Sequence, residues 1–420
     1  MSLIVERAAL PANPTELARR LAGRPGVVLA RVEGGKQTVL ACDPCARSHT
    51  LDPEPSLPRQ RQALGQTPRW FGLIPYDAVR GLEGDLDSDS RASAQLSEPL
   101  WLRYPAVARI GETVEVIGES PGAVRDLLRN LAAPARASEV SLELAEPAEP
   151  ELQHLVRVRA ALEQIARGEI YEVNLARRFS LRVRGLAWDL LAQLEGTGRM
   201  PHAFALESDD LSVVAASPEL CLSLDAEGGL LTSPIKGTRP RHEDPTEDAR
   251  LAQDLDQDPK ERAELTMIVD VERNDLGRVA EVGSVRLSVP PHVVALPGIH
   301  HRVATVEAKL RPELSRAELL SAVLPSGSVT GAPKRRAMQL IRELEPYRRG
   351  LYTGVVGFVA HDGGVELKMA IRTLSAVEGR GQYFTGGGIV ADSVPEREVE
   401  ETLWKAERLL RLLAATSARN

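Results

Sequence analysis

The chain contains many short runs of apolar and β-branched residues, and this feature limits the possible fold more than any other. These runs occupy residues 26–35, 37–44, 107–119, 170–183, 202–208, 211–217, 219–227, 352–360, 364–377 and 382–391. Helical apolar spacing is found at 120–135, 151–169, 260–275, 331–345 and 395–415. Strands in hairpin-like succession, with helices between the groups, predict an α+β fold rather than strict βαβ alternation.

The overall charge and the hydropathy pattern exclude two classes of partner. The chain has 420 residues and a net charge of −7, so we expect no sequence-independent binding to nucleic acid phosphates. No apolar run approaches the roughly 18 residues of a membrane span, and the first residues lack the apolar core of a signal peptide. We therefore expect a cytoplasmic enzyme or binding protein with no membrane partner.

A change of composition suggests how the chain is divided. Residues 133–151 (APARASEVSLELAEPAEPE) are rich in proline, alanine and glutamate, which is typical of a linker. We expect an N-terminal region at 1–132 and a larger catalytic unit at 152–420. Within that unit, AEGGLLTSPIKG predicts a turn and a short strand that carries Lys236, and 239–259 predicts a charged loop.

Two pairs of glutamates lie on predicted helices. Glu261 and Glu264 are three residues apart in one helix, and Glu398 and Glu401 are three apart in the last. This spacing puts each pair on one helix face. If the two faces meet, a cation must neutralise the four carboxylates, and oxygen-only ligands select Mg²⁺. Glutamate pairs are also common on solvated faces, so the spacing alone leaves both interpretations open.

Two glycine-containing segments could bind an anion through backbone N–H groups. Residues 385–393 (TGGGIVADS) follow a strand-like run, and residues 324–334 (LPSGSVTGAPK) lead into a helix. A plain turn and a simple helix cap are the alternatives.

Three single polar residues are further candidates. Glu219 could donate a proton if burial raises its pKa. Arg372 lies in an otherwise apolar strand, and its planar guanidinium suits a carboxylate. His301 could be a site residue or a buried core histidine.

Taken in order, these segments resemble the chorismate-utilising enzymes, which include the large subunits of anthranilate, aminodeoxychorismate and isochorismate synthases. The resemblance covers about 150–412, through YEVNLARRF, SPEL, PIKGTRPR, KERAELTMIVDVERNDLGRV, LPSGSVTGAPKRRAMQLI, YTGVVGFV, IRTL and TGGGIVADSVPEREVEETLWKA. The N-terminal region matches more loosely, through VLARVEGG and PYDAVRGLE. The resemblance implies an anthranilate synthase component I-like fold, with two interlocked subdomains around large antiparallel sheets and helices outside.

The resemblance assigns the two glutamate pairs to magnesium. It implies that Glu264 and Glu401 bind Mg²⁺, with Glu261 and Glu398 close by. The metal would hold the ring carboxylate of chorismate.

The resemblance also implies roles for residues around the substrate. Glu219 would protonate the departing ring hydroxyl, and His301 would pack against the ring. The other residues implied to line the pocket are Arg372 and Tyr352, which would hold the pyruvyl carboxylate, the backbone of Gly387 and Gly388, and the side chains of Lys405, Ser328 and Thr238.

Lys236, in PIKGT, separates two reactions of the family that this chain resembles. Anthranilate synthases carry alanine there, and ammonia attacks ring carbon 2 directly. The lysine is typical of aminodeoxychorismate synthases: its amine adds at carbon 2 as the carbon 4 hydroxyl leaves, and ammonia then adds at carbon 4 and expels the lysine. The product, 4-amino-4-deoxychorismate, is a precursor of p-aminobenzoate and folate. Because only a neutral amine is nucleophilic, we expect burial beside the metal to depress the pKa of Lys236.

Two positions depart from patterns of the family. Amino-transferring members usually carry glutamine where this chain has Glu172, which could accept a proton from ammonia, pair with Lys236 or merely be tolerated. Isochorismate synthases carry a water-activating lysine there, so Glu172 disfavours that reaction. Arg31 stands where feedback-regulated anthranilate synthases carry a tryptophan-binding serine, which argues against a standard tryptophan pocket.

The expected reaction requires ammonia from a separate glutamine amidotransferase subunit, because we recognise no amidotransferase segment in the sequence. The leading expectation is an Mg²⁺-dependent subunit that forms aminodeoxychorismate. Anthranilate synthesis is the alternative within the same class, and a catalytically inactive chorismate-binding subunit is the alternative of another class. The four glutamates, Arg372 and Lys236 disfavour inactivity, because decay should first remove charges that are costly to bury.

Overall fold

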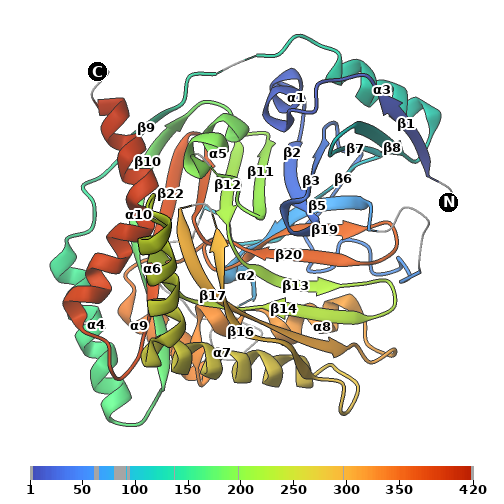
Figure 1. Ribbon diagram of the computed structural model, residues 1–420. Helices are drawn as coiled ribbons and strands as arrows, with labels where there is room; N and C mark the ends of the chain where they lie inside the picture. Colours follow the sequence, from blue (N-terminus) through green and yellow to red (C-terminus); the bar gives the residue numbers. More distant parts are fainter. Residues whose placement is uncertain are drawn as a thin grey trace.

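The computed structural model describes residues 3–60, 66–79, 91, 95–136, 138–196, 198–296 and 298–417. These residues form two large β-sheets with helices outside them (Figure 1). Neighbouring strands in both described sheets run antiparallel. The expected α+β class and the expected large antiparallel sheets are therefore confirmed.

The first sheet has twelve strands among the described residues. They are β1 (Ile4–Ala8), β2 (Val27–Val32), β3 (Gln37–Ala41), β7 (Ala106–Ile110), β8 (Val114–Gly118), β9 (Ser141–Leu144), β10 (Glu172–Arg184), β11 (His202–Ser208), β12 (Leu211–Ser217), β18 (Gly331–Ala332), β21 (Thr373–Val377) and β22 (Arg380–Ile389). Their order is β1-β8-β7-β3-β2-β11-β12-β21-β22-β10-β18, and β9 pairs with β10. Strands far apart in the chain, such as β10 and β22, are thus neighbours.

The second sheet has ten strands in the described part of the chain. They are β4 (Ala46–Ser48), β5 (Pro68–Ile74), β6 (Leu100–Arg103), β13 (Leu220–Leu224), β14 (Gly229–Ser233), β15 (Ile235–Pro240), β16 (Arg286–Leu296), β17 (Ile299–Lys309), β19 (Val355–Ala360) and β20 (Val365–Met369). Their order is β15-β17-β14-β13-β20-β19-β5-β6-β4, and β16 pairs with β17. Both sheets take strands from 1–132 and from 152–420; the proposed domain boundaries stay a prediction.

The helices lie against the outer sides of the sheets (Figure 1). They are α1 (Pro14–Arg20), α2 (Tyr76–Val79), α3 (Pro121–Leu131), α4 (Glu151–Ala166), α5 (Ala187–Glu195), α6 (Pro245–Gln257), α7 (Pro259–Gly277), α8 (Arg316–Val323), α9 (Lys334–Leu344) and α10 (Pro395–Ser417). Each of the five segments with helical apolar spacing contains a helix. None of the described helices is long and apolar enough to cross a membrane.

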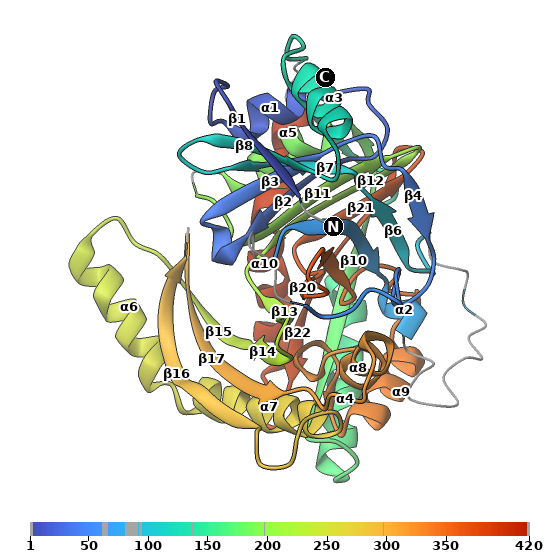
Figure 2. The ribbon, with the colours of Figure 1, turned by 90° about the vertical axis from the view of Figure 1, so that its right-hand side faces the viewer.

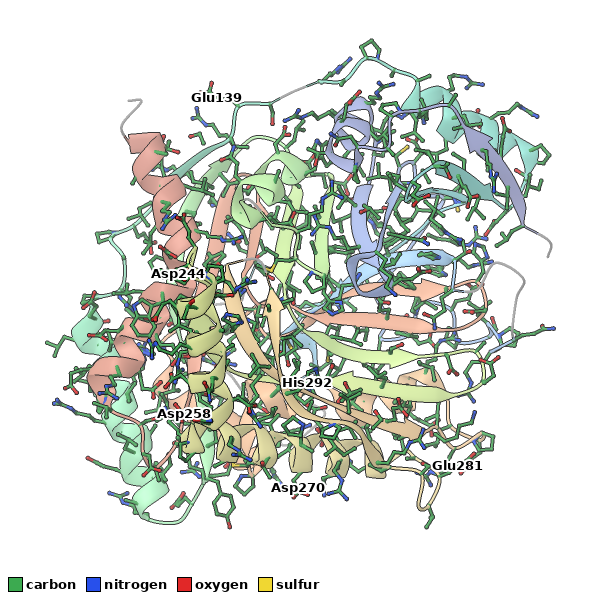
Figure 3. The ribbon with its side chains drawn as sticks, in the orientation of Figure 1. Glu139, Asp244, Asp258, Asp270, Glu281 and His292 are labelled. Atoms are coloured by element: carbon green, nitrogen blue, oxygen red, sulfur yellow. The ribbon has the colours of Figure 1, made fainter. Side chains whose placement is uncertain are left out.

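The segment at 239–259, expected to be a charged loop, is mostly helical. Helix α6 begins at Pro245, directly after Asp244, whose side chain accepts a hydrogen bond from the backbone N–H of Thr246. Asp244 is labelled in Figure 3. Of the α6 residues only Leu255 is buried. The expectation was wrong because it followed the many charged residues of this segment, although its N-cap, its first-turn proline and its amphipathic spacing are readable from the sequence.

A central hydrophobic layer joins the two sheets. Val28 and Phe204 of the first sheet belong to the same buried cluster as Phe71 and Phe358 of the second. Within the second sheet, the rings of Phe71 and Phe358 meet edge to face, with centroids 6.1 Å apart. The shared cluster packs the two sheets against each other. The segment PYDAVRGLE, at 75–83, lies partly outside the described residues.

Candidate active site

The candidate site lies where β10, β15 and β22 approach helices α7 and α10. Figure 2 shows β15, β16 and β17 curving between α6 and α7. Asp258, labelled in Figure 3, begins α7 by accepting hydrogen bonds from the backbone N–H groups of Lys260 (2.9 Å) and Glu261 (3.2 Å). This cap places the first glutamate pair in the first two turns of α7.

Glycines allow the strands to approach the charged side chains closely. A Cβ atom on Gly387 would lie 3.3 Å from Glu401 Oε1 and 3.5 Å from Glu398 Oε2. A Cβ atom on Gly388 would lie 2.2 Å from Glu172 Oε1 and 3.1 Å from Lys236 Nζ. The glycine triplet therefore runs beside both the glutamates of α10 and the lysine of β15, and a side chain at 388 would displace the carboxylate of Glu172.

The two glutamate pairs are brought together, and lysines lie among them. Lys260 Nζ is 3.5 Å from Glu264 Oε1 and 3.2 Å from Glu398 Oε1, so it links α7 to α10. Lys405 Nζ is 2.6 Å from Glu401 Oε1 and donates a hydrogen bond to the backbone oxygen of Gly386 (2.8 Å). The predicted meeting of the two helix faces is thus observed, whereas the lysines between the carboxylates were not predicted as counter-ions.

The electrostatics of the glutamate cluster follow from burial and like charge. Burial, together with the carboxylate of Glu172, raises the pKa of Glu264 to about 7 against the opposing charge of Lys236. Burial, followed by the charge of Glu401, raises the pKa of Glu261. Burial acts the same way on Glu401, but the ammonium of Lys405 outweighs it and lowers the pKa of Glu401. The raised pKa values of Glu261 and Glu264 indicate that the neighbouring lysines do not fully offset burial and the charges of the other carboxylates.

The donor set of this cluster suits a hard divalent cation. In the present side-chain arrangement, the described residues contain no group of three or more His, Cys, Asp or Glu side chains that could hold a metal ion. Lys260 stands between two of the carboxylates instead. However, Glu264 Oε1 is buried and accepts no hydrogen bond from the described residues. A buried carboxylate oxygen that accepts no hydrogen bond and has Lys260 Nζ 3.5 Å away fits Mg²⁺, which takes oxygen ligands only.

Lys236 is buried, but its predicted charge state is not found. Its side chain is 9% exposed, and its Nζ donates a hydrogen bond of 2.5 Å to Glu172 Oε1. Burial favours the neutral amine, yet the carboxylates of Glu172 and Glu264 outweigh burial and raise the pKa of Lys236. In the metal-free site the pKa shift is thus opposite to the expectation, which considered burial and the metal but not a carboxylate paired with the amine.

Glu219 has the raised pKa that a proton donor needs. It follows β12 and is 4% exposed, and its Oε1 accepts a hydrogen bond of 2.7 Å from Ser328 Oγ. Burial raises the pKa of Glu219 to about 7, against the lowering effect of the Ser328 hydroxyl. Ser328 lies in a short 3₁₀ turn, Gly327–Val329, inside the segment predicted to bind an anion. A carboxyl group that keeps its proton near neutral pH can serve as a general acid.

A pH dependence follows from this pKa. If Glu219 must be protonated, kcat/KM should fall about tenfold per pH unit above the pKa of about 7. Replacing Ser328 by alanine removes a hydrogen bond that lowers the pKa, so the alkaline limb should move to higher pH. We would measure kcat/KM for chorismate consumption between pH 6 and about 9 for both proteins. An alkaline limb that Ser328→Ala leaves in place would contradict the assignment of Glu219.

Arg372 is a cation without an ion-pair partner among the described residues. Burial lowers the pKa of Arg372 to about 10, so the group stays charged at neutral pH. Its Nη2 donates a hydrogen bond to His301 Nε2 (3.1 Å), while His301 Nδ1 lies 3.0 Å from the backbone oxygen of Gly237 and 3.3 Å from Thr238 Oγ1. These partners select a neutral imidazole with its proton on Nδ1, and burial lowers the pKa of His301 to about 3. The guanidinium remains available for an anionic ligand.

Tyr352 lies beside the glycine triplet of β22. Its ring stacks on Phe384 of β22, with centroids 5.0 Å apart. A Cβ atom on Gly386 would lie 2.9 Å from the Tyr352 hydroxyl oxygen. Burial raises the pKa of Tyr352, so its hydroxyl keeps its proton and can donate a hydrogen bond. The residues named from the sequence thus gather around β15, β17 and β22, and their individual roles stay predictions.

Arg31, which was expected to argue against a standard tryptophan pocket, forms a buried ion pair. Its Nη1 and Nη2 pair with both carboxylate oxygens of Glu195, and Nη1 also donates a hydrogen bond to the backbone oxygen of Met200 (2.6 Å). The ion pair is buried. Arg31 and Glu195 line a cavity of about 200 Å³ beside α5, away from the glutamate cluster.

Two positions were missed or left open by the sequence analysis. Lys260 was not considered, although it lies four residues before Glu264, a spacing that places both on one helix face. Glu172 was noticed only because glutamine is usual there, and the structure now pairs it with Lys236. No sequence signal could place that pair, because its members come from β10 and β15 in different sheets.

Comparison with known proteins decides the family of this chain. The family described as chorismate binding enzyme matches residues 33–411. The chain belongs to this family. The family consists of chorismate binding enzymes. The roles implied for the glutamates, Arg372 and Lys236 stay predictions.

Relatives within the chorismate binding enzyme family carry two different names. Aminodeoxychorismate synthase component 1 of Klebsiella aerogenes is 46% identical over 246 residues, which cover 59% of this chain and 54% of the relative. Anthranilate synthase component 1 of Thermus thermophilus is 43% identical over 265 residues, which cover 63% and 57%. The chain thus spans about half the length of the curated relatives it matches, and identity alone does not separate the two names.

Solved structures of the family share the fold. Anthranilate synthase component I from Streptococcus pneumoniae superimposes with a TM-score of 0.76 at 28% identity, covering 89% of this chain and 91% of that one. The isochorismate synthase MenF from Escherichia coli gives a TM-score of 0.77 at 19% identity, covering 98% and 94%. The anthranilate synthase component I-like fold is therefore confirmed.

Proposed function

We propose that this chain is an aminodeoxychorismate synthase component I, which converts chorismate and ammonia to 4-amino-4-deoxychorismate through a covalent intermediate on Lys236. The observation that carries this proposal is the position of Lys236. Its Nζ is buried beside Gly388 and next to the carboxylate of Glu172, and its charge interacts with Glu219 and Glu264. An amine held among the general acid and the glutamate cluster can reach a ring bound between them.

Two groups of residues would hold the carboxylates of chorismate. Arg372, supported by His301, would bind the pyruvyl carboxylate, with the Tyr352 hydroxyl and the backbone of Gly387 and Gly388 beside it. The available guanidinium of Arg372 supports this assignment. Glu219, which keeps its proton near neutral pH, would protonate the hydroxyl that leaves ring carbon 4.

Magnesium would belong to the glutamate cluster. Glu264 and Glu401 would be ligands, with Glu261 and Glu398 close by. The buried Oε1 of Glu264, which accepts no hydrogen bond from the described residues, supports this choice. When bound, Mg²⁺ would supply positive charge that neutralises the ring carboxylate of the substrate.

Product identification tests the proposal directly. Chorismate, Mg²⁺ and an ammonium salt are incubated with the protein, and the products are separated by chromatography with and without an added aminodeoxychorismate lyase. We expect no direct anthranilate, and p-aminobenzoate only after the lyase is added. Direct formation of fluorescent anthranilate would establish the alternative, anthranilate synthesis. The similarity to the Thermus anthranilate synthase component 1 is the reason to test for it. A protein that consumes no chorismate under these conditions would be an inactive binding subunit.

Replacing Glu264 by glutamine should weaken the dependence on magnesium. Loss of one carboxylate ligand should raise the Mg²⁺ concentration for half-maximal activity at least about tenfold. The metal-free protein should be no less stable, because burial raises the pKa of Glu264 to about 7 and its ionised form costs stability above that pH. Mg²⁺ titrations of activity and of the melting temperature measure both effects.

Asp270→Asn is the matched control for Glu264→Gln. Asp270 lies on the same helix with a side chain that is 83% exposed, and it is labelled in Figure 3. Removing its charge tests for a general electrostatic effect of α7. An Mg²⁺ requirement that changes equally in both variants would contradict a ligand role for Glu264.

A glutamine amidotransferase subunit is the proposed source of ammonia, in keeping with the component 1 names of the relatives. The proposed setting is the cytoplasm, in p-aminobenzoate and folate synthesis. Co-purification with a glutamine amidotransferase, and glutamine-dependent turnover only in its presence, would support this partner.

A further inference from the structure

We propose that Glu172 is the catalytic base that takes the proton of the Lys236 ammonium and later returns it. This inference rests on the proposed function, because it concerns the same reaction at the same site. It assigns a catalytic role to a position at which this chain departs from the usual glutamine.

The geometry places the two groups in direct contact. Lys236 Nζ and Glu172 Oε1 are 2.5 Å apart, and Glu172 is 1% exposed. Of the carboxylates in the described residues, only Glu172 accepts a hydrogen bond from this amine. Glu219 accepts its hydrogen bond from Ser328 instead, and Glu264 faces Lys260. A proton can therefore pass from Lys236 to Glu172 across one short hydrogen bond, without a mediating group.

The surroundings hold the carboxylate against the amine. Glu172 begins β10, where it pairs with Ala332 of β18, and two residues later Asn174 pairs with Gly388 of β22. A Cβ atom on Gly388 would overlap Glu172 Oε1 at 2.2 Å. Because residue 388 has no side chain, the carboxylate of Glu172 can occupy the position in which it contacts Lys236.

Glu172 is held through one of its two carboxylate oxygens. Its Oε2 is buried and accepts no hydrogen bond from the described residues. Glu345, in contrast, uses both oxygens on Arg349 in a structural pair of the same chain. The side-chain hydrogen bond of Glu172 is therefore made at the oxygen that contacts the amine.

The direct hydrogen bond makes the proton transfer possible. The carboxylates around Lys236 favour its charged form, so the ionic pair keeps Lys236 protonated before the reaction. Transfer of the proton to Glu172 across the 2.5 Å hydrogen bond then produces the neutral amine that the reaction needs.

The proposed steps balance in protons and electrons. Lys236 gives one proton to Glu172, and the nitrogen lone pair forms a bond to ring carbon 2. The ring diene electrons shift and break the bond from carbon 4 to its hydroxyl, which leaves as water with the proton of Glu219. Ammonia then bonds to carbon 4, the electrons shift back, and the bond from carbon 2 to Lys236 breaks with its electron pair on nitrogen. Glu172 returns its proton to Lys236, and the new ammonium group on carbon 4 restores the proton of Glu219.

The test isolates the first half of the reaction. Wild type, Glu172→Gln and Glu172→Asp are mixed with chorismate and Mg²⁺ without ammonia, quenched in acid at short times, and analysed by intact-protein mass spectrometry. The adduct has the mass of the protein plus chorismate less one water. Glutamine keeps the size and the hydrogen-bond acceptor but is not a base. We expect Glu172→Gln to slow adduct formation about 100-fold, with chorismate affinity retained, and Glu172→Asp to be intermediate.

Controls separate this inference from the proposed function. Glu169→Gln removes an exposed carboxylate, paired with Arg336, three residues before Glu172, and should leave the adduct rate unchanged. Adduct formation by Glu172→Gln at the wild-type rate would overturn the inference and leave the proposed function standing. A wild type that forms neither adduct nor aminodeoxychorismate would instead refute the proposed function. Melting temperatures and chorismate binding of each variant show whether the fold and the substrate site are intact.

Discussion

Replacing Lys236 by alanine is expected to slow formation of 4-amino-4-deoxychorismate on the order of 10³-fold or more, because the variant lacks the nucleophile of the proposed first step. The pocket would keep its other charged groups, so chorismate should still bind. Ammonia could then attack carbon 2 directly, as the resemblance implies for members with alanine at this place. Chromatography of the products, with fluorescence detection of anthranilate, measures both the lost and the diverted reaction.

A second variant controls for the charge that this substitution leaves behind. Without Lys236, the carboxylate of Glu172 is buried and unpaired, which costs stability or forces it to take up a proton. The double variant Lys236→Ala/Glu172→Gln removes that charge and should recover the melting temperature, but not the activity. A Lys236→Ala protein with the wild-type rate and product would remove the covalent role of the lysine.

Replacing Arg349 by methionine should destabilise the protein by about 3–5 kcal/mol, the largest stability effect we expect from a single substitution. Arg349 is 1% exposed, and it donates hydrogen bonds of 2.9 and 2.7 Å to the two carboxylate oxygens of Glu345. It also donates to the backbone oxygens of Asn174 (2.7 Å) and Val329 (3.1 Å). The guanidinium thus ties β10 to the turn that carries Ser328. Chemical denaturation of both proteins measures the change in the free energy of unfolding.

The matched control for Arg349→Met removes both charges. The double variant Arg349→Met/Glu345→Leu leaves no buried charge unpaired and should recover part of the lost stability. If the single variant is as stable as the wild type, the ion pair contributes nothing to the fold. If the double variant is as unstable as the single one, the backbone hydrogen bonds of Arg349 are the dominant contribution.

The predicted helices show where apolar pattern is a sufficient guide. Helices α7 and α10 were found from their apolar spacing, and both bury one face against the sheets. Helix α6 was predicted as a loop from the many charged residues of its segment, and it buries only Leu255. Two local signals favour the helix: Asp244 caps its first turn, and Pro245 occupies its first position. Its contacts with β15 and β17 also stabilise it, and these depend on the tertiary structure.

The candidate site was predictable in its residue types and less so in its charge states. The i,i+3 spacing correctly put each glutamate pair on one face, but it carried no information on which cations lie between the faces. Lys236 illustrates the consequence. Its burial was anticipated, whereas the direction of its pKa shift depended on Glu172, which lies 64 positions earlier in the chain.

Local chemistry, the α+β class, five of the ten described α-helices and the identity of the charged residues could all be read from the order of amino acids, because each depends on neighbours within a few positions. The arrangement of these charges could not. Strands β10, β15 and β22 meet only through sheet pairing and packing over long separations. That meeting gives Lys236 a carboxylate partner and leaves Glu172 Oε2 without a hydrogen-bond donor among the described residues. Electrostatic interactions depend on distances in space, so the folded chain alone decides which groups hold protons and which exchange them.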